Sequence, residues 1–538
     1  NRFVAIIGTI DENEIKKLAK DMKDKINKEV KNAIDTIMKE LEINLSDTQK
    51  RVLDFQISDF PQIYWVAIPW RKGNNDLLIN DLEDFFIRQK LNNWNEFYNF
   101  AKNNGEFLPN IGFIYQLLYT ALEKSMGARK NLREFNYQEE KGRKCSVCGE
   151  RNVLFFWETK NKNKFLRYNP DALDLTNRIE RKYLSNGEGL CSICFLKRGF
   201  EIYLEKEVDK KVFKDFSFPS TAEVSCADFK QMIKEKANKE TKELFEKYIS
   251  EFLKIANVKV EPLPKLKKML KLEKENNIEG YWLYEENLTK EKIKEELGIE
   301  MPAEKLKELK NLLNKLYEKI KKPTPYYAII YLDGDNMGKW LSGELLPEIR
   351  YAYNSDVWVN KLPDQFKIKL EKILKQLDSE KKKAKKILSP AIHSAISTAL
   401  KNYAIEFVKK IVEEEHLGKL IYAGGDDVLA FVNLKDILDI MEKLRWAFSG
   451  NIKVVNGKIE VDLNNTSGFV LKDGVYYLTM GNNATCSMGV VITHYKEPLK
   501  IVIDKVFVMN KKAKDEGKER FAISLLKKSG EERIGSAK

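Results

Sequence analysis

Lys419-Leu-Ile-Tyr-Ala-Gly-Gly-Asp-Asp-Val-Leu-Ala-Phe-Val432 is the stretch that decides the fold. One apolar run enters Gly-Gly-Asp-Asp and a second leaves it, a pattern typical of a β-hairpin with a tight turn. Glycine and aspartate are common in such turns, so the tetrapeptide alone is also compatible with an ordinary hairpin. The predicted hairpin places two adjacent carboxylates, Asp426 and Asp427, at its tip.

A second acidic segment, Tyr326-Tyr-Ala-Ile-Ile-Tyr-Leu-Asp-Gly-Asp-Asn-Met-Gly338, lies upstream of the hairpin. Its apolar run predicts a buried strand that ends at Asp333 and Asp335, and Gly334 frees the backbone there. Carboxylates at a strand end and on a neighbouring hairpin are suited to hold two Mg²⁺ ions on a nucleoside triphosphate. This chemistry is that of a nucleotidyl transferase or cyclase.

The order of elements after Pro325 predicts that these two acidic segments meet. Strand, helix, hairpin, helix and strand are expected at 326–333, 390–413, 419–432, 435–448 and 485–493. This β-α-β-β-α-β order is the ferredoxin-like, or palm, arrangement, in which the first strand lies beside the central hairpin. A further helix at 499–514 and a short strand at 521–525 follow. The predicted catalytic residues and metal ligands are Asp333, Asp426 and Asp427, with Mg²⁺ or Mn²⁺ as the cation.

Two features suit this palm to triphosphate binding. The backbone N–H groups from Gly334 to Gly338 turn into the next segment and can hold phosphates. Lys514 lies in the last turn of a predicted helix beside the palm, where it can neutralise the triphosphate. Lys511 is the second candidate, and a solvated lysine at a helix end is the alternative for both.

Four cysteines form two C-x-x-C pairs, Cys145-Ser-Val-Cys148 and Cys191-Ser-Ile-Cys194. Two such pairs supply the four thiolates of a tetrahedral structural Zn²⁺ site. Residues 149–190 make the spacing longer than in a usual zinc ribbon, which predicts an insertion in the finger. Disulfides are the alternative, and they are disfavoured in a charged cytosolic protein. Cys226 and Cys486 are expected to be buried packing residues.

Composition places the whole chain in a broad class. The 538 residues carry a formal net charge of +13, and 33% of them are charged. The abundance of lysine and glutamate is typical of a thermophile, and the positive excess favours an anionic partner such as RNA. There is no apolar run of about 18 residues and no signal-like leader, so we expect a cytoplasmic protein without a membrane span.

The periodicity divides the chain into four predicted domains of an α+β protein. Strands are expected at 3–10 and 63–68, a long amphipathic helix at 11–42, and largely helical structure at 81–125. Lysine- and glutamate-rich helices follow up to Pro323 and Pro325, which mark a boundary. The predicted domains are 1–140, the zinc-binding segment 141–227, the helical domain 228–322 and the palm 323–538.

The motifs together resemble the large polymerase-cyclase subunit of type III CRISPR effector complexes, most closely that of the III-B, or Cmr, branch. The motifs are Leu332-Asp-Gly-Asp-Asn-Met-Gly338, Tyr422-Ala-Gly-Gly-Asp-Asp-Val-Leu-Ala-Phe431, the run from Ser487 to Leu499, and Ala513-Lys-x-x-Gly-Lys518, with the two cysteine pairs upstream. Diguanylate cyclases share the palm, but here Asp427 and Val428 replace their Glu and Phe.

The resemblance implies two cyclase-like palms, of which the first, at 1–140, is degenerate, together with a zinc-binding segment and a helical domain. It implies that ATP is converted to cyclic oligoadenylate when the complex of subunits and guide RNA captures target RNA. By motif position, Asp333 and Asp426 are metal ligands and Asp427 is a ligand or an electrostatic partner. The implied nucleotide-binding residues are Gly334, Asp335, Asn336, Gly338, Gly424, Gly425, Ser487 and Lys514. His494 falls in the strand beside the site and is expected to pack rather than act as a base.

Two departures from the family's pattern keep a second hypothesis open. The family often begins with an HD nuclease domain, and no His-Asp dipeptide occurs here. It usually ends in a helical domain, whereas this sequence stops soon after its last predicted palm strand. The alternative to a nucleotidyl transferase is therefore a nucleotide-binding structural scaffold of the complex without turnover.

Overall fold

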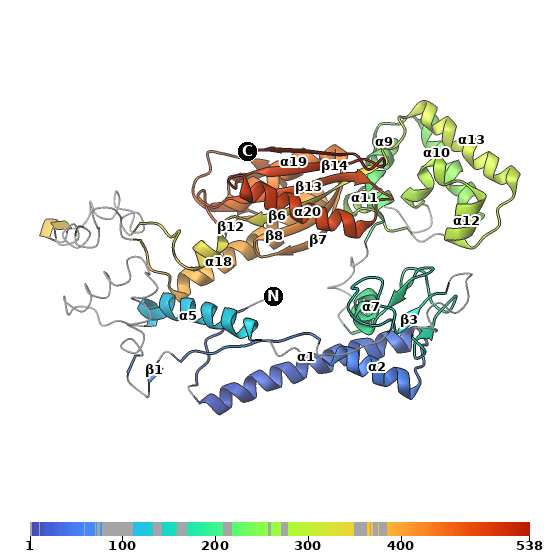
Figure 1. Cartoon of the computed structure of the whole chain (residues 1–538). Helices are drawn as coiled ribbons and strands as arrows, with labels where there is room; N and C mark the ends of the chain where they lie inside the picture. The colour runs from blue at the N-terminus through green and yellow to red at the C-terminus, as the bar shows by residue number, and fades with distance from the viewer. Residues whose placement is uncertain are drawn as a thin grey trace. The chain divides into compact units, whose positions relative to one another are not determined.

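The computed structural model divides the chain into two compact units, residues 1–216 and 217–538, which Figure 1 draws along one colour scale. The residues that it describes are 3–9, 11–58, 60–69, 71–72, 76–77, 111–132, 142–158, 169–207, 218–256, 260–270, 278–348, 363–365, 367–368, 375 and 385–538. Within this part of the chain, no helix is long and apolar enough to cross a bilayer.

The first unit is built on the long helix α1 (Glu12–Glu40), which confirms the helix predicted at 11–42. Helix α2 (Asp47–Ile57) begins with a capping box between Ser46 and Gln49. The remaining elements described before residue 140 are β1 (Arg71–Lys72), β2 (Asp76–Leu77) and α5 (Ile111–Asn131).

The strands predicted at 3–10 and 63–68 are wrong for the described residues 3–9 and 63–68, which carry no strand. An apolar run becomes a strand only where a neighbouring strand satisfies its N–H and C=O groups, and no described segment pairs with these runs. Residues 81–110 of the predicted helical stretch lie outside the described residues. The degenerate palm expected at 1–140 therefore stays a prediction.

The cysteine pairs lie in a small subdomain of the first unit. A three-stranded sheet of order β4-β3-β5 is followed by helix α7, which packs on α1. The bounds are β3 (Phe155–Phe156), β4 (Leu173–Asp174), β5 (Gly189–Leu190) and α7 (Ser192–Glu207). Ile34 and Ile37 of α1 share a core with Phe155 and Phe195, so the apolar stripe of α1 is covered by this subdomain over its C-terminal part.

The second unit centres on a six-stranded sheet of order β15-β14-β13-β6-β8-β7. Four adjacent strands of this sheet, β13-β6-β8-β7, have the ferredoxin-like arrangement predicted from the sequence. The strands are β6 (Tyr326–Gly334), β7 (Gly418–Gly424), β8 (Asp427–Asn433), β13 (Cys486–His494), β14 (Phe521–Leu526) and β15 (Glu532–Ala537). The sequence did not predict β15 or two small hairpins, β9 (Ile452–Val455) with β10 (Lys458–Val461) and β11 (Phe469–Lys472) with β12 (Val475–Leu478).

Alternating residues of β6 face two different cores. Ala328, Ile330 and Leu332 pack against α18 (Pro390–Asn402), the π-helical segments η4 (Tyr403–Val408) and η5 (Lys410–Glu415) that continue it, and α19 (Ile437–Ser449). Tyr327 and Ile329 face α20 (Leu499–Asp515), which lies along the sheet in Figure 1. Because side chains alternate along a strand, Asp333 belongs to the α20 side.

The helices of residues 221–319 share their core with this second face of the sheet. They are α8 (Thr221–Ser225), α9 (Ala227–Glu235), α10 (Lys239–Leu253), α11 (Pro264–Leu270), α12 (Lys290–Leu297) and α13 (Ala303–Lys319), with two short 3₁₀ turns at Gly280–Leu283 and Glu285–Asn287. Asn433, at the end of β8, donates through Nδ2 to the carbonyl oxygens of Val224 (2.9 Å) and Ser225 (3.1 Å).

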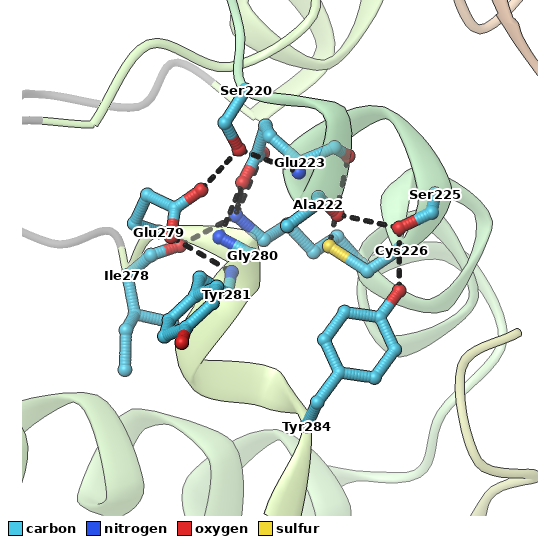
Figure 2. A network of polar contacts seen from close by, with 11 residues as sticks. Ser220, Ala222, Glu223, Ser225, Cys226, Ile278, Glu279, Gly280, Tyr281 and Tyr284 are labelled. Atoms are coloured by element: carbon cyan, nitrogen blue, oxygen red, sulfur yellow. Dashed lines mark hydrogen bonds and ion pairs between the residues drawn. The ribbon is translucent and has the colours of Figure 1, made fainter. Parts of the chain in front are cut away.

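A buried ion pair stabilises the start of this helical part. Lys230 and Glu223 are each at most 2% exposed, and Lys230 Nζ lies 2.7 Å from both carboxylate oxygens. Figure 2 shows the surrounding network, in which the Gly280 N–H donates to Glu223 (2.8 Å) and Ser220 contacts Glu279. Burial and the neighbouring Glu223 carboxylate raise the pKa of Glu279 to about 7.

We expect the substitution Lys230→Met to lower the free energy of unfolding of the second unit by about 3–5 kcal/mol, because it leaves Glu223 buried without its cation. Urea denaturation followed by far-UV circular dichroism measures the change. Lys294→Met is the matched control, since the Lys294–Glu300 pair is exposed and such pairs contribute about 0–1 kcal/mol. Equal stability of the two variants would contradict the prediction.

Candidate active site in the palm

The fold brings the predicted acidic residues together at one end of the sheet. Asp333 of β6 lies directly opposite Asp427 of β8 in the antiparallel register. The Gly334 N–H donates to the Asp426 carbonyl oxygen (3.0 Å), which fixes the hairpin against the end of β6. Gly425 has a φ of 71°, a left-handed conformation that the tight turn requires and that glycine adopts without strain.

Lys514 completes this cluster from the last turn of α20. Its ammonium contacts the Asp333 carboxylate and donates to the Gly334 carbonyl oxygen (3.2 Å). Lys511, the second candidate, is exposed on the same helix. Helix α20 approaches closely because Gly489 of β13 has no side chain, since a Cβ there would lie 2.3 Å from the Val506 carbonyl oxygen. The structure therefore brings Lys514 to the acidic end of the sheet.

Burial and the closeness of the carboxylates raise the pKa values of Asp426 and Asp427. Burial, followed by repulsion from Asp333, raises the pKa of Asp426 to about 6, although Lys514 partly offsets the effect. Burial also raises the pKa of Asp427, while a hydrogen bond from Tyr422 opposes the shift. Close carboxylates with raised pKa values are a typical property of catalytic or cation-binding sites.

The raised pKa of Asp426 predicts that the second unit becomes less stable as the pH rises. From about pH 4 to pH 6 the folded chain retains a proton that the unfolded chain has released, so stability decreases through this window and stays lower above it. We expect Asp426→Asn to stabilise the second unit at pH 7.5 by about 1–2 kcal/mol, and not at pH 4. Thermal melts without added magnesium test this, with Asp504→Asn on the exposed side of α20 as the control. No gain at pH 7.5 would contradict it.

Two of the predicted nucleotide-binding side chains contact each other. Asp335 is 1% exposed, and its carboxylate accepts hydrogen bonds from Ser487 Oγ (2.7 Å) and Thr485 Oγ1 (2.8 Å). Asn336 has a φ of 56° and precedes α14 (Met337–Leu341), in which Gly338 lies. Gly424 is the last residue of β7 and pairs with Asp427. The nucleotide-binding roles of all these residues stay predictions.

Sequence reasoning missed the residues that close this end of the palm. Lys518 contacts the Asn336 side chain, and the Glu519 N–H donates to Asp335 (3.0 Å). Arg445 of α19 reaches Glu519 at 2.6 Å. The second lysine of the Ala513-Lys-x-x-Gly-Lys518 motif was the available signal for Lys518, whereas nothing local in the sequence marks Arg445.

His494 does not belong to the acidic cluster. In the β13–β6 register it pairs with Tyr326, at the end of the strand opposite Asp333. Its ring stacks on Tyr495 and meets Tyr326 edge-on, and burial lowers its pKa. The expectation that His494 packs rather than acts as a base is consistent with this position.

The four cysteines converge in the first unit. Cys145, Cys148, Cys191 and Cys194 are free thiols, and their Sγ atoms all lie within 4.8 Å of one another. The Cys148–Cys191 Sγ separation is 3.8 Å, and four sulfurs about 2.3 Å from one Zn²⁺ would be separated by about 3.8 Å in a tetrahedron. Among the described residues, no other group of three or more candidate ligands is this close. The cluster fits a structural zinc ion.

Helix α2 is hydrogen-bonded to the segment that follows the first cysteine pair and to the segment between the cysteines of the second pair. The Gln56 side-chain oxygen accepts from both the N–H and the hydroxyl of Ser192 (2.8 Å each), and its Nε2 donates to the Asn152 carbonyl oxygen (2.9 Å). The Ser146 N–H donates to the Gly189 carbonyl oxygen (2.8 Å), which joins the first knuckle to β5. Hydrogen bonds made by the residues next to metal ligands help to orient those ligands.

Comparison with known proteins agrees with the sequence motifs. Residues 326–522 match the family model for the second palm domain of Cas10/Cmr2. The chain is 29% identical over 550 residues to the CRISPR system Cmr subunit Cmr2 of Pyrococcus furiosus, a match that covers 98% of this chain and 52% of that protein. It is 26% identical over 462 residues to the corresponding subunit of Saccharolobus solfataricus, with 70% and 41% covered.

A solved structure shares the fold. It is described as the apo state of a type III-B Cmr-beta complex, and one of its chains matches with a TM-score of 0.51 and 18% identity, covering 95% of this chain and 56% of its own. The chain thus spans about half the length of the curated relatives it matches. The family model assigns one palm, and the resemblance to the large subunit drawn from the motifs is confirmed.

Proposed function

Because this chain is related to the Cas10/Cmr2 large subunits of type III-B Cmr complexes, we propose that it is a metal-dependent nucleotidyl transferase of such an RNA-guided complex. It would join ATP molecules into cyclic oligoadenylate when the complex binds target RNA. The observation that carries the proposal is the convergence of Asp333 and the Asp426–Asp427 hairpin at one sheet end, with Lys514 against them.

The donor set fits divalent cations. Asp333, Asp426 and Asp427 offer hard oxygen ligands. Burial and repulsion from Asp333 raise the pKa of Asp426, and a bound cation would relieve the repulsion. When bound, Mg²⁺ or Mn²⁺ supplies Lewis-acid stabilisation of the attacking hydroxyl and of the leaving pyrophosphate. Asp333 and Asp426 would hold the ions, and Asp427 would add the negative charge that retains them.

The reaction balances without a histidine base. The 3′-oxygen of one ATP forms a bond to the α-phosphorus of another. The bond between that phosphorus and the oxygen that bridges the α- and β-phosphates breaks, and pyrophosphate leaves with the electron pair. The hydroxyl proton passes to solvent. Lys514 would offset the triphosphate charge, and the backbone from Gly334 to Gly338 would face the phosphates.

A second function, a nucleotide-binding scaffold without turnover, is favoured by one contact. The Lys514 ammonium already neutralises Asp333, so this carboxylate has a cation from the protein itself. In that case the palm would bind ATP weakly or as a structural ligand, and guide RNA and the other subunits would assemble around it.

The experiment that separates the two uses the chain assembled with its complex subunits, guide RNA and target RNA. The complex is incubated with α-labelled ATP and Mn²⁺, and the products are resolved by chromatography. Label in cyclic oligoadenylate, with one pyrophosphate released for each adenylate incorporated and only in the presence of target RNA, supports the transferase. Retained ATP without product supports the scaffold.

A further inference from the structure

We propose that Asp335 is a positioning residue, which holds the turn after α20, and through it Lys514, against the acidic end of β6. This inference rests on the proposed function, because the placement of Lys514 matters to a reaction only if the palm turns ATP over. It assigns to Asp335 a role distinct from that of Asp333, which lies two residues before it on the same segment.

The Asp335 carboxylate is committed to protein donors on both oxygens. Ser487 Oγ donates to Oδ1 (2.7 Å), and both Thr485 Oγ1 (2.8 Å) and the Glu519 N–H (3.0 Å) donate to Oδ2. The Asp335 N–H donates in turn to the Thr485 carbonyl oxygen (2.8 Å). A carboxylate accepts about four hydrogen bonds, so little capacity is left on a side chain that is 1% exposed. Asp335 therefore binds protein from two directions.

The turn that it holds has an unfavourable backbone conformation. Lys518 and Glu519 are consecutive non-glycine residues with φ values of 64° and 47°, in the left-handed region that side chains disfavour. Such residues persist where surrounding contacts fix them. Here the contacts are the Asp335 bond to the Glu519 N–H, the Arg445–Glu519 ion pair (2.6 Å) and the Lys518–Asn336 contact.

The turn is joined directly to the end of α20. The Gly517 N–H donates to the Lys514 carbonyl oxygen (3.3 Å), and the Lys518 N–H donates to the Ala513 carbonyl oxygen (3.2 Å). A displaced turn would therefore move the last helical turn, which carries Lys514. Because Lys514 contacts Asp333, Asp335 sets the geometry of this pair without touching either side chain in any described contact.

The test compares Asp335→Ala with Asp335→Asn in the target-activated complex. We expect Asp335→Ala to lower kcat about 100-fold and to change KM for ATP less than about 3-fold. The reason is that displacing a catalytic group such as Lys514 by about 1 Å has an effect of this size on the rate. Asp335→Asn should retain kcat within about 10-fold, because its side-chain oxygen still accepts the Glu519 N–H while the rotatable hydroxyls of Ser487 and Thr485 adapt. Lys538→Ala, which removes only an exposed partner of Glu519, is the control.

Hydrogen exchange of the Glu519 amide in the intact chain gives a readout independent of turnover. Exchange should be faster in Asp335→Ala than in the wild type and in Lys538→Ala. Unchanged exchange would overturn the proposal, and so would wild-type kcat despite faster exchange. It would also be overturned if Asp335→Ala raised the Mg²⁺ concentration needed for half-maximal activity as much as Asp333→Ala does. Absence of product from the wild-type complex would instead refute the proposed function, while exchange would still decide whether Asp335 holds the turn.

Discussion

Replacing Asp426 and Asp427 together with alanine should reduce oligoadenylate synthesis by at least about 1,000-fold in the target-activated complex. The substitution removes two of the three predicted metal ligands, and losing preorganised charge at a reacting centre has effects of this size. Folding should be retained, because both residues lie at the tip of a hairpin and neither belongs to an apolar core.

Product formation from radiolabelled ATP measures this effect, and thermal melts show that the variant is folded. Asp504→Ala is the matched control, since it removes one carboxylate from the exposed side of α20. The control should keep wild-type activity. Wild-type synthesis by the doubly substituted chain would show that the active-site assignment is wrong.

The second large effect concerns the cysteine cluster. We expect one Zn²⁺ per chain in protein purified without chelator, and we expect Cys191→Ser to lose it. Binding of structural zinc contributes about 10–16 kcal/mol in zinc-finger peptides, so the cysteine subdomain should unfold at a much lower temperature without its ion. The palm should keep its own transition, because the two units are separately compact.

Elemental analysis gives the zinc content, and limited proteolysis reports where the chain opens. Cleavage should concentrate within residues 142–207 of the Cys191→Ser variant. Cys226→Ala is the control for zinc content, because this buried thiol lies in the second unit. Wild-type protein without zinc, or a Cys191→Ser variant that retains it, would refute a four-cysteine site.

The palm could be predicted because several local signals agree on it. Apolar runs of strand length, a Gly-Gly-Asp-Asp turn and alternating helices define one topology, and that topology alone brings Asp333 opposite Asp427. The cysteine cluster was predictable for a similar reason, since paired ligands at C-x-x-C spacing have few other uses. In both cases, a short sequence motif contains the residues that form the site.

Features that depend on distant partners were not predictable. The runs at 3–9 and 63–68 are as apolar as the palm strands, but no described segment pairs with them. The periodicity of residues 228–322 shows which helix faces are apolar, but not that they share a core with Ile329 and Phe431 of the palm sheet. Likewise, the sequence places Asp335 beside Asp333 but does not reveal that its carboxylate turns toward Ser487.

Strand β8 connects the acidic cluster of the palm to the helices that precede the palm in the sequence. Its first residue, Asp427, lies in the acidic cluster, and its last, Asn433, is bonded to the backbone of Val224 and Ser225. Both neighbours in the sheet hold the strand along its length, so it acts as a stiff rod of about 23 Å. A change in the position of the Val224–Ser225 backbone would therefore reach the Asp426–Asp427 hairpin as a displacement along the strand axis.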